Sequence, residues 1–280
     1  MINSLLMMAT LSLILGADGD MGMTPDAARM EGVWRFDFVE VDGTRKPEPP
    51  FATNKVIMLK DGRFVITQGS QFTHGVMKID STKKPKQYDS TITRGTAKGL
   101  TFSCIYELDG DSLKLCGSYR GGDRPGDFVT GPGSGLVMQV LKREKQNVQD
   151  ALREVAQKEL FGSWQGISCT RDGSPESGED SKKMRVAFDP DGKITVVEGD
   201  GVSHSASTTI DALVDPLAID IVYTDGKMKG QIWLGIATID GDSLTICRAM
   251  PGKTRPTEFR SDPGSGRTLV TWHRLEAEKK

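Results

Sequence analysis

Two serines of this chain lie in short motifs that could supply a nucleophile. Ser112 and Ser243 each stand in a Gly-Asp-Ser-Leu tetrapeptide. A hydrolytic serine needs a sharp turn between a strand and a helix, and a histidine base that an aspartate orients. The residues three before His74, His204 and His273 are Gln71, Gly201 and Val270, so no aspartate stands there to orient a histidine. We therefore predict no catalytic residue and no enzyme.

The histidines and the paired aspartates do not have the spacing of a metal site. His74 and His204 lie at nearly equivalent positions of two sequence copies, without a second His, Cys or carboxylate at ligand spacing. The Asp-x-Asp pairs at 109–111 and 189–191 lack the loop and closing Glu of a calcium site. We expect no metal and no cofactor, and strand histidines whose hydrogen bonds are satisfied.

Arg124 and Arg255 each precede a proline in a glycine-rich loop. A guanidinium group in such a loop could hold the carboxylate of a ligand through paired donors. An acid three residues further on, Asp127 or Glu258, favours a simpler interpretation, in which a local ion pair fixes the loop. Both interpretations stay open at this point.

The element that positions these residues is a hairpin that occurs twice. Tyr106–Cys116 returns 131 residues later as Ala237–Cys247. Alternating apolar residues surround Asp-Gly-Asp-Ser in both, which is typical of a β-hairpin with a glycine in its turn. Placing Glu107 opposite Lys114 gives a favourable cross-strand pair. The chain is therefore a tandem repeat.

Composition allows two globular domains and argues against nucleic acid as a partner. The chain has 280 residues, of which 37% are hydrophobic, and a formal charge of −2. Two cores of ordinary size fit this length, and nothing in the charge balance attracts nucleic acid. Of the four cysteines, Cys116 and Cys247 are equivalent but Cys104 and Cys169 are not, so we expect unpaired thiols.

An apolar run at the amino terminus suggests export. Ile2–Leu15 is too short to span a bilayer and has the length of a signal-peptide core, with Ala17 before a cleavage site. We predict an extracytoplasmic protein, periplasmic or secreted, without stable membrane insertion.

Short alternating strands separated by turn residues fill both halves of the chain. This pattern predicts an all-β fold of two tandem antiparallel barrels, about eight strands each, joined by a helical linker. The predicted segments are a signal peptide (1–17), a short segment with a helix (18–29), domain 1 (30–143), the linker (144–159), domain 2 (160–275) and a charged tail (276–280).

The order of motifs in each copy resembles known β-barrel families. Gly-x-Trp on the first strand, after a short helix, is similar to lipocalins. The fuller series continues with Asp-Gly, Ile-Asp, Leu-Asp-Gly-Asp-Ser-Leu-x-Leu-Cys, Arg-Pro and Pro-Gly-Ser-Gly. That series resembles a planctomycete family of uncharacterised lipocalin-like repeat domains and covers 30–143 and 160–274. This family brings no established activity.

The lipocalin resemblance implies a closing pair at one end of each barrel. In lipocalins the first-strand Trp lies under an Arg from the last strand. The corresponding residues are Trp34 with Arg143 and Trp164 with Arg274. The alternative is that the two arginines are exposed and make no such contact.

Two kinds of function fit such barrels. Inward residues could line an apolar pocket for a small apolar or amphipathic ligand, and the candidates are Phe36, Phe38, Phe64, Phe102 and Tyr106, with Arg124 and Arg255 near the mouth. If these aromatics fill a solid core instead, the protein is a structural or adaptor repeat that binds protein partners through its loops. Gly166 and Ser168 replace Phe36 and Phe38, so domain 2 is expected to be roomier.

Overall fold

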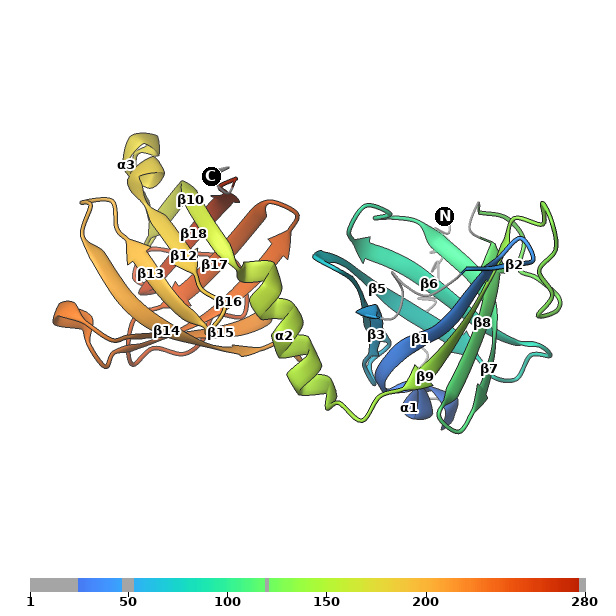
Figure 1. The fold of residues 1–280 in the computed structure, drawn as a ribbon. Helices are drawn as coiled ribbons and strands as arrows, with labels where there is room; N and C mark the ends of the chain where they lie inside the picture. Colours follow the sequence, from blue (N-terminus) through green and yellow to red (C-terminus); the bar gives the residue numbers. More distant parts are fainter. Residues whose placement is uncertain (1–24, 47–52, 119–120, 277–280) are drawn as a thin grey trace, which may run out of the picture.

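The computed structural model describes residues 25–46, 53–118 and 121–276. They form two closed antiparallel β-barrels of eight strands with a helix between them, which confirms the predicted fold class (Figure 1). The predicted signal peptide and most of the charged tail lie outside the described residues. No described helix is both long and apolar enough to cross a membrane.

Barrel 1 follows a simple up-and-down order. Its elements are α1 (Pro25–Met30), β1 (Gly32–Val41), β2 (Thr44–Lys46), β3 (Lys55–Met58), β4 (Arg63–Gln68), β5 (Gln71–Asp80), β6 (Lys86–Arg94), β7 (Thr101–Asp109), β8 (Ser112–Ser118) and β9 (Leu136–Arg143). Strand β1 pairs with β3, each strand from β3 onward pairs with the next, and β1 also pairs with β9 to close the ring. Strand β2 is a short addition to β1.

Barrel 2 repeats this order after the linker helix. Its elements are α2 (Val148–Leu160), β10 (Gly162–Arg171), β11 (Ser174–Pro175), α3 (Gly178–Lys183), β12 (Arg185–Phe188), β13 (Lys193–Val197), β14 (Ser203–Asp211), β15 (Leu217–Tyr223), the 3-10 turn η2 (Gly226–Met228), β16 (Ile232–Asp240), β17 (Ser243–Ala249) and β18 (Arg267–Arg274). The β10–β18 pairing closes the ring. The sequence pattern did not predict α3.

The repeated hairpin has the predicted register. Leu108 is opposite Leu113 in β7–β8, and Glu107 is opposite Lys114, whose Nζ lies 2.9 Å from the Glu107 carboxylate. The turn uses Gly110 at φ +54°, a conformation that costs glycine little. In barrel 2, Thr238 is opposite Thr245 in the same way.

A β-bulge on β1 corrects the prediction that Phe38 points into barrel 1. The pairing of β1 with β9 shifts between Phe36 and Phe38, so that Val39 and not Phe38 joins Phe36 in the core. One extra residue in a strand reverses the alternation of its side chains. Phe38 lies outside, where the Arg45 guanidinium is 4.1 Å from its ring centroid.

Helix α3 fills the space that the small residue Gly166 leaves on the first strand of barrel 2. A Cβ atom at Gly166 would collide with the backbone oxygen of Ser181, and would lie 3.2 Å from the Met184 Cβ. Ser181 and Met184 are both buried, so the end of α3 occupies the space that Phe36 occupies in barrel 1. The interior cavity of barrel 2 measures about 20 Å³, which is room for about one water molecule.

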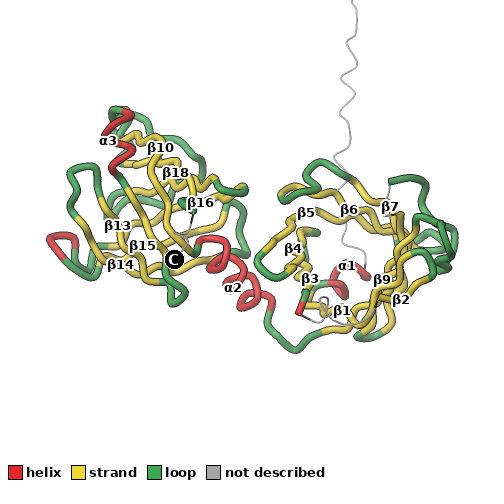
Figure 2. The backbone as a smooth tube through the Cα atoms, turned by 45° about the horizontal axis from the view of Figure 1, so that its top comes forward, coloured by secondary structure: helices red, strands yellow, loops and turns green. Residues whose placement is uncertain are grey.

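Helix α2 packs against both barrels with different residues. Ala151, Leu152 and Val155 contact Val33, Ile57 and other residues on the outside of barrel 1, whereas Ala156 and Leu160 belong to the core of barrel 2. Figure 2 shows α2 beside barrel 2 and facing the edge of barrel 1 that carries β3 and β4. A single helix therefore contributes to two cores.

Candidate functional site

The two candidate closing pairs lie at equivalent places in the barrels. The Arg143 guanidinium carbon is 4.2 Å from the ring centroid of Trp34, and that of Arg274 is 3.9 Å from that of Trp164. Trp34 Nε1 donates to Met30 O at 2.9 Å, and Trp164 Nε1 donates to Leu160 O at 2.8 Å. Each arginine also donates to backbone oxygens at the end of the helix before its barrel, including Glu31 O and Phe161 O at 2.6 and 2.7 Å. These contacts stabilise the barrel ends and leave little of either guanidinium group for a ligand.

Arg124 and Arg255 form ion pairs that the sequence did not indicate. Arg124 NH2 lies 2.6 Å from the carboxylate of Asp89, and Arg255 NH2 lies 2.7 Å from that of Asp220. The expected local partners were wrong, because strands β6 and β15 bring carboxylates closer than the loop does. Both arginines also donate to strand carbonyls, such as Cys104 O and Gly235 O. Each therefore fastens its loop to the barrel wall.

The inward aromatics of barrel 1 pack against one another and against helix α1. Phe36, Phe64 and Tyr106 are buried in one cluster with Met30, and Phe102 is partly buried against it. Helix α1 lies across the end of this barrel (Figures 1 and 2). The Tyr106 hydroxyl donates to Asp26 of α1 at 2.9 Å. In this packing the aromatic side chains fill a core.

The serines, histidines and cysteines make no catalytic arrangement among the described residues. Ser112 and Ser243 begin strands after tight turns, and Ser243 faces His273 across β17–β18 without a hydrogen bond between their side chains. No group of three or more His, Cys, Asp and Glu residues suited to a metal ion occurs in the described part of the chain.

The four cysteines are unpaired. Burial raises the pKa of the Cys104 and Cys169 thiols to about 12, and also raises the pKa of Cys116 and Cys247. Because the thiolate is the nucleophile, these residues are poor nucleophiles at neutral pH.

His74 and His204 face opposite sides of their barrels. His74 pairs with Val65, which packs outside barrel 1 against α2, whereas His204 pairs with Val196 of the barrel 2 core. The extra residue of the second copy lies in the turn between Val197 and Ser203, and a shift of one residue moves a side chain to the other face. The two histidines therefore have unrelated surroundings.

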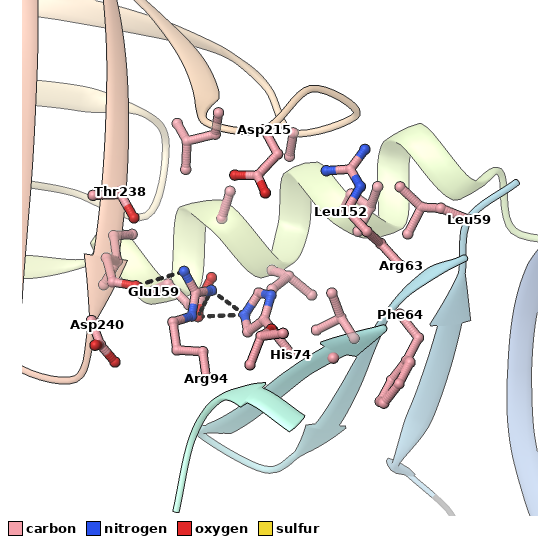
Figure 3. Close-up of a pocket in the computed structure, with 18 of the residues that line it drawn as sticks. Leu59, Arg63, Phe64, His74, Arg94, Leu152, Glu159, Asp215, Thr238 and Asp240 are labelled. Atoms are coloured by element: carbon pink, nitrogen blue, oxygen red, sulfur yellow. Dashed lines mark hydrogen bonds and ion pairs between the residues drawn. The ribbon is translucent and has the colours of Figure 1, made fainter. Parts of the chain in front are cut away.

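His74 belongs to a cavity of about 360 Å³ between the barrels (Figure 3). The carboxylate of Glu159 on α2 lies 2.8 Å from His74 Nε2 and 2.6 Å from Arg94 NH2. Arg94 NH1 donates to Ile239 O of barrel 2 at 2.6 Å, and Lys98 forms an ion pair with Asp240 at 2.7 Å. Since these charged groups bond to one another across the interface, we attribute the cavity to the docking of the barrels.

The mouth of barrel 2 holds a second and different cluster. An open pocket of about 670 Å³ is lined by charged and aromatic residues, including Arg171, Glu198, His204, Trp233 and Arg248. Arg248 is buried, with NH1 2.6 Å from the Tyr223 hydroxyl and its guanidinium 4.6 Å from the Trp233 ring centroid.

Glu198 joins two arginines of this mouth. Its carboxylate lies 2.6 Å from Arg171 NH2 and 3.2 Å from Arg248 NH2. Burial alone would raise the pKa of Glu198, but the two guanidinium groups outweigh burial and hold this pKa below its ordinary value. In turn, Tyr223 and Glu198 raise the pKa of Arg248 despite its burial. The network is charged at neutral pH.

Three polar atoms around the mouth have no hydrogen-bond partner. They are buried atoms of the described residues, namely Trp233 Nε1, His204 Nδ1 and Asp225 Oδ1. Buried polar groups are nearly always paired, so these atoms can accept a water molecule or a polar group of a ligand as a partner. This feature distinguishes the mouth from the cavity between the barrels.

Barrel 1 lacks the charged and hydrogen-bonding residues of the mouth at the matching strand positions. The registers place Val41, Ile92, Phe102 and Gly117 of barrel 1 where barrel 2 has Arg171, Tyr223, Trp233 and Arg248. Gln68 stands at the position of Glu198. The sequence prediction missed this site, although a comparison of the copies position by position shows the substitutions.

Comparisons with known proteins identify no family. No protein-family model matches the chain, and no curated protein is similar to it. A crystal structure of a protein of unknown function from the DUF3598 family of Nostoc punctiforme PCC 73102 matches 88% of this chain and 97% of its own, with 13% sequence identity and a TM-score of 0.26. Values this low assign neither family nor function.

Proposed function

We propose that this protein is a non-catalytic binding protein in which the mouth of barrel 2 holds a small amphipathic molecule. The observation that carries this proposal is the substitution between the copies. Charged and aromatic residues replace apolar residues and a glycine at matching positions, and one of them, Trp233, keeps an unpaired N–H. A purely structural repeat has no need of a buried arginine such as Arg248, since burying a charge costs free energy that only excellent pairing offsets.

The lining of the mouth disfavours an anion and fits a ligand that has an oxygen acceptor. Four carboxylates and two guanidinium groups line it, so the surplus of negative charge repels anions. Trp233 Nε1 offers a donor, and Met228 and the Trp233 ring offer apolar surface. A ketone, ester or amide attached to a ring or a short chain would match these groups.

The small interior cavity limits how deep the ligand reaches. Met184, Trp272 and their neighbours fill the barrel below the mouth and leave about 20 Å³. The ligand therefore lies in the mouth and not along the barrel axis. In this proposal barrel 1, with its packed aromatic core, acts as a scaffold.

The remaining sequence expectations fit this proposal. The motif series in both copies supports membership of the planctomycete lipocalin-like repeat family, and the apolar run at 2–15 supports an exported binding protein. Family membership and export are therefore part of the proposal. A structural or adaptor repeat that binds protein through its loops is the alternative.

Prodan, an uncharged naphthalene ketone whose fluorescence reports its surroundings, tests the site. We expect saturable binding to the wild-type chain, no comparable binding of anionic naphthoate, and a Kd about five- to tenfold weaker for Trp233→Phe, which is the effect of about 1 kcal/mol from one lost hydrogen bond. Trp272→Phe is the matched control, because its indole N–H is also unpaired but lines the interior cavity.

Native mass spectrometry of protein from its own host, followed by organic extraction, would identify the natural ligand class. Absence of prodan binding, or equal effects of the two Trp variants, would reject the site and favour the adaptor.

A further inference from the structure

We infer that residues 224–231 form a lid over the mouth of barrel 2, and that protonation of His204 fastens it. The inference rests on the proposed ligand site, because it concerns how that site opens. It follows from the contacts between β14 and the segment that joins β15 to β16.

His204 lies just below this segment. It is on β14 inside barrel 2, its side chain is 15% exposed, and its ring meets the edge of Tyr223 at a centroid distance of 5.8 Å. The His204 Nδ1 atom is 3.7 Å from Asp225 Oδ1, which is too long for a hydrogen bond. Both atoms are buried without a hydrogen-bond partner. A small movement of the segment would join them.

The base of the lid is fixed to β14. Asp225 Oδ2 accepts from the backbone N–H of Ser205 at 2.9 Å, and the N–H of Thr224 donates to Ser205 O at 2.8 Å. The backbone and side-chain hydrogen bonds from Ser205, and then the His204 ring, hold the pKa of Asp225 below its ordinary value. Asp225 is therefore a carboxylate at neutral pH, ready to accept from an imidazolium.

The rest of the segment is shaped to approach the ring. Gly226 has φ +64°, and a Cβ atom there would lie 3.1 Å from His204 Nδ1. Met228, two residues later, lines the mouth and packs against the core of barrel 2. A bond between Asp225 Oδ1 and His204 Nδ1 would hold Gly226 against the ring and Met228 against the pocket.

Protonation supplies the missing donor. Histidine changes its charge between about pH 5 and 8, and an imidazolium carries a proton on Nδ1 that Asp225 Oδ1 can accept. The other charged groups of the mouth are Arg171 and Glu176 near β10 and β11, Asp180 on α3, Glu198 and Asp200 after β13, and Arg248 on β17. Carboxylates outnumber guanidinium groups among them, so these elements bring no net positive charge against an imidazolium.

Nuclear magnetic resonance of the ligand-free chain tests the lid directly. We expect the backbone amide signals of 225–230 to shift with pH along the same curve as the His204 ring, and to lose this response in Asp225→Asn. His273→Gln is the matched control, since His273 is exposed on β18 of the same barrel and should leave the response intact. Amide signals that do not follow His204, or a response that survives in Asp225→Asn, would overturn the inference.

Stopped-flow release of prodan tests the consequence for the site. We expect release at about pH 5.5 to be about tenfold slower than at about pH 7.5, as one charge-assisted hydrogen bond can provide. His204→Gln and Asp225→Asn should both abolish this difference. If prodan does not bind, the proposed function fails while the magnetic resonance experiment still decides whether the lid exists. Binding with equal release rates at the two pH values would reject the lid alone.

Discussion

In each barrel one arginine of the last strand makes two kinds of contact. Arg143 and Arg274 stack on the first-strand tryptophans and also donate to carbonyls at the end of the preceding helix. A planar guanidinium with five donors can stack and cap at once, which a lysine ammonium cannot do. The last strand therefore joins the first strand and the helix that leads into it, so one residue stabilises three elements.

Asp26 of α1 is a second residue with a structural role, and it predicts a pH dependence. Burial alone would raise the pKa of Asp26, but hydrogen bonds from Lys86 and Tyr106 and the charges of Lys86 and Arg29 outweigh burial and lower this pKa. The ionised carboxylate thus stabilises the folded state above the unfolded pKa of about 3.9, and this contribution disappears as the pH falls through the lower folded pKa.

We expect Asp26→Asn to lower the free energy of unfolding at pH 7 by about 1–3 kcal/mol, because it removes a charge-assisted network. Urea unfolding between about pH 5 and 3 should show a smaller loss of stability for this variant than for the wild-type chain. Asp109→Asn, at an exposed turn, should keep the wild-type pH dependence. Parallel curves for Asp26→Asn and wild type would contradict the role of Asp26.

Among the elements, α3 decides how the two barrels differ inside. Its N-cap Ser177 accepts from the N–H of Asp180, and Asp180 forms an ion pair with Lys183 at the end of the helix. Ser181 and Met184 then enter the space above Gly166. The end of α3 therefore supplies the side chains that fill the space over Gly166, where barrel 1 has the side chain of Phe36.

The approach of α3 to β10 predicts opposite effects for two glycine substitutions. Gly166→Ala should destabilise barrel 2 by about 1–3 kcal/mol, because the new methyl group collides with the Ser181 carbonyl and overpacks the site. Gly178→Ala, in α3 itself but with no atom within 4 Å of its Cβ, should be neutral or slightly stabilising. Thermal unfolding followed by near-ultraviolet circular dichroism measures both, and equal effects would show that α3 does not pack as described.

At the scale of the whole molecule, α2 and a set of polar contacts hold the two barrels together. The helix buries Leu152 and Val155 against barrel 1 and Leu160 in barrel 2. Arg94 and Lys98 of barrel 1 bond directly to Ile239 and Asp240 of barrel 2. We therefore expect the barrels to unfold together.

Leu152→Asp tests this coupling. A carboxylate among the apolar residues of the α2 contact with barrel 1 costs several kcal/mol, of the order of 2–5. Differential scanning calorimetry should show one transition for the wild-type chain and two for the variant. Glu154→Asp introduces the same residue on the exposed face of the helix and should keep one transition. A single transition in Leu152→Asp would mean that the polar contacts alone couple the barrels.

Local chemistry was enough to predict the repeated architecture. Turn glycines, alternating apolar residues and the copied Asp-Gly-Asp-Ser hairpin act within a few residues, and the structure confirms two antiparallel barrels and the hairpin register. The lipocalin resemblance also implied the places of Trp34, Arg143, Trp164 and Arg274, because its closing pair depends on which strand comes first and last.

Contacts between residues far apart in the sequence decided which way side chains point and which charged groups pair. A bulge turned Phe38 outward, an extra turn residue put His204 inside barrel 2, and strand pairing gave Arg124 and Arg255 partners on other strands. Glu198 and Arg248, 50 residues apart, meet only because the barrel closes. The sequence by itself determined which elements form and how neighbouring strands pair. Only the tertiary structure decided which face each side chain occupies and which charges meet, since one shifted residue reverses a face and ring closure brings distant strands together.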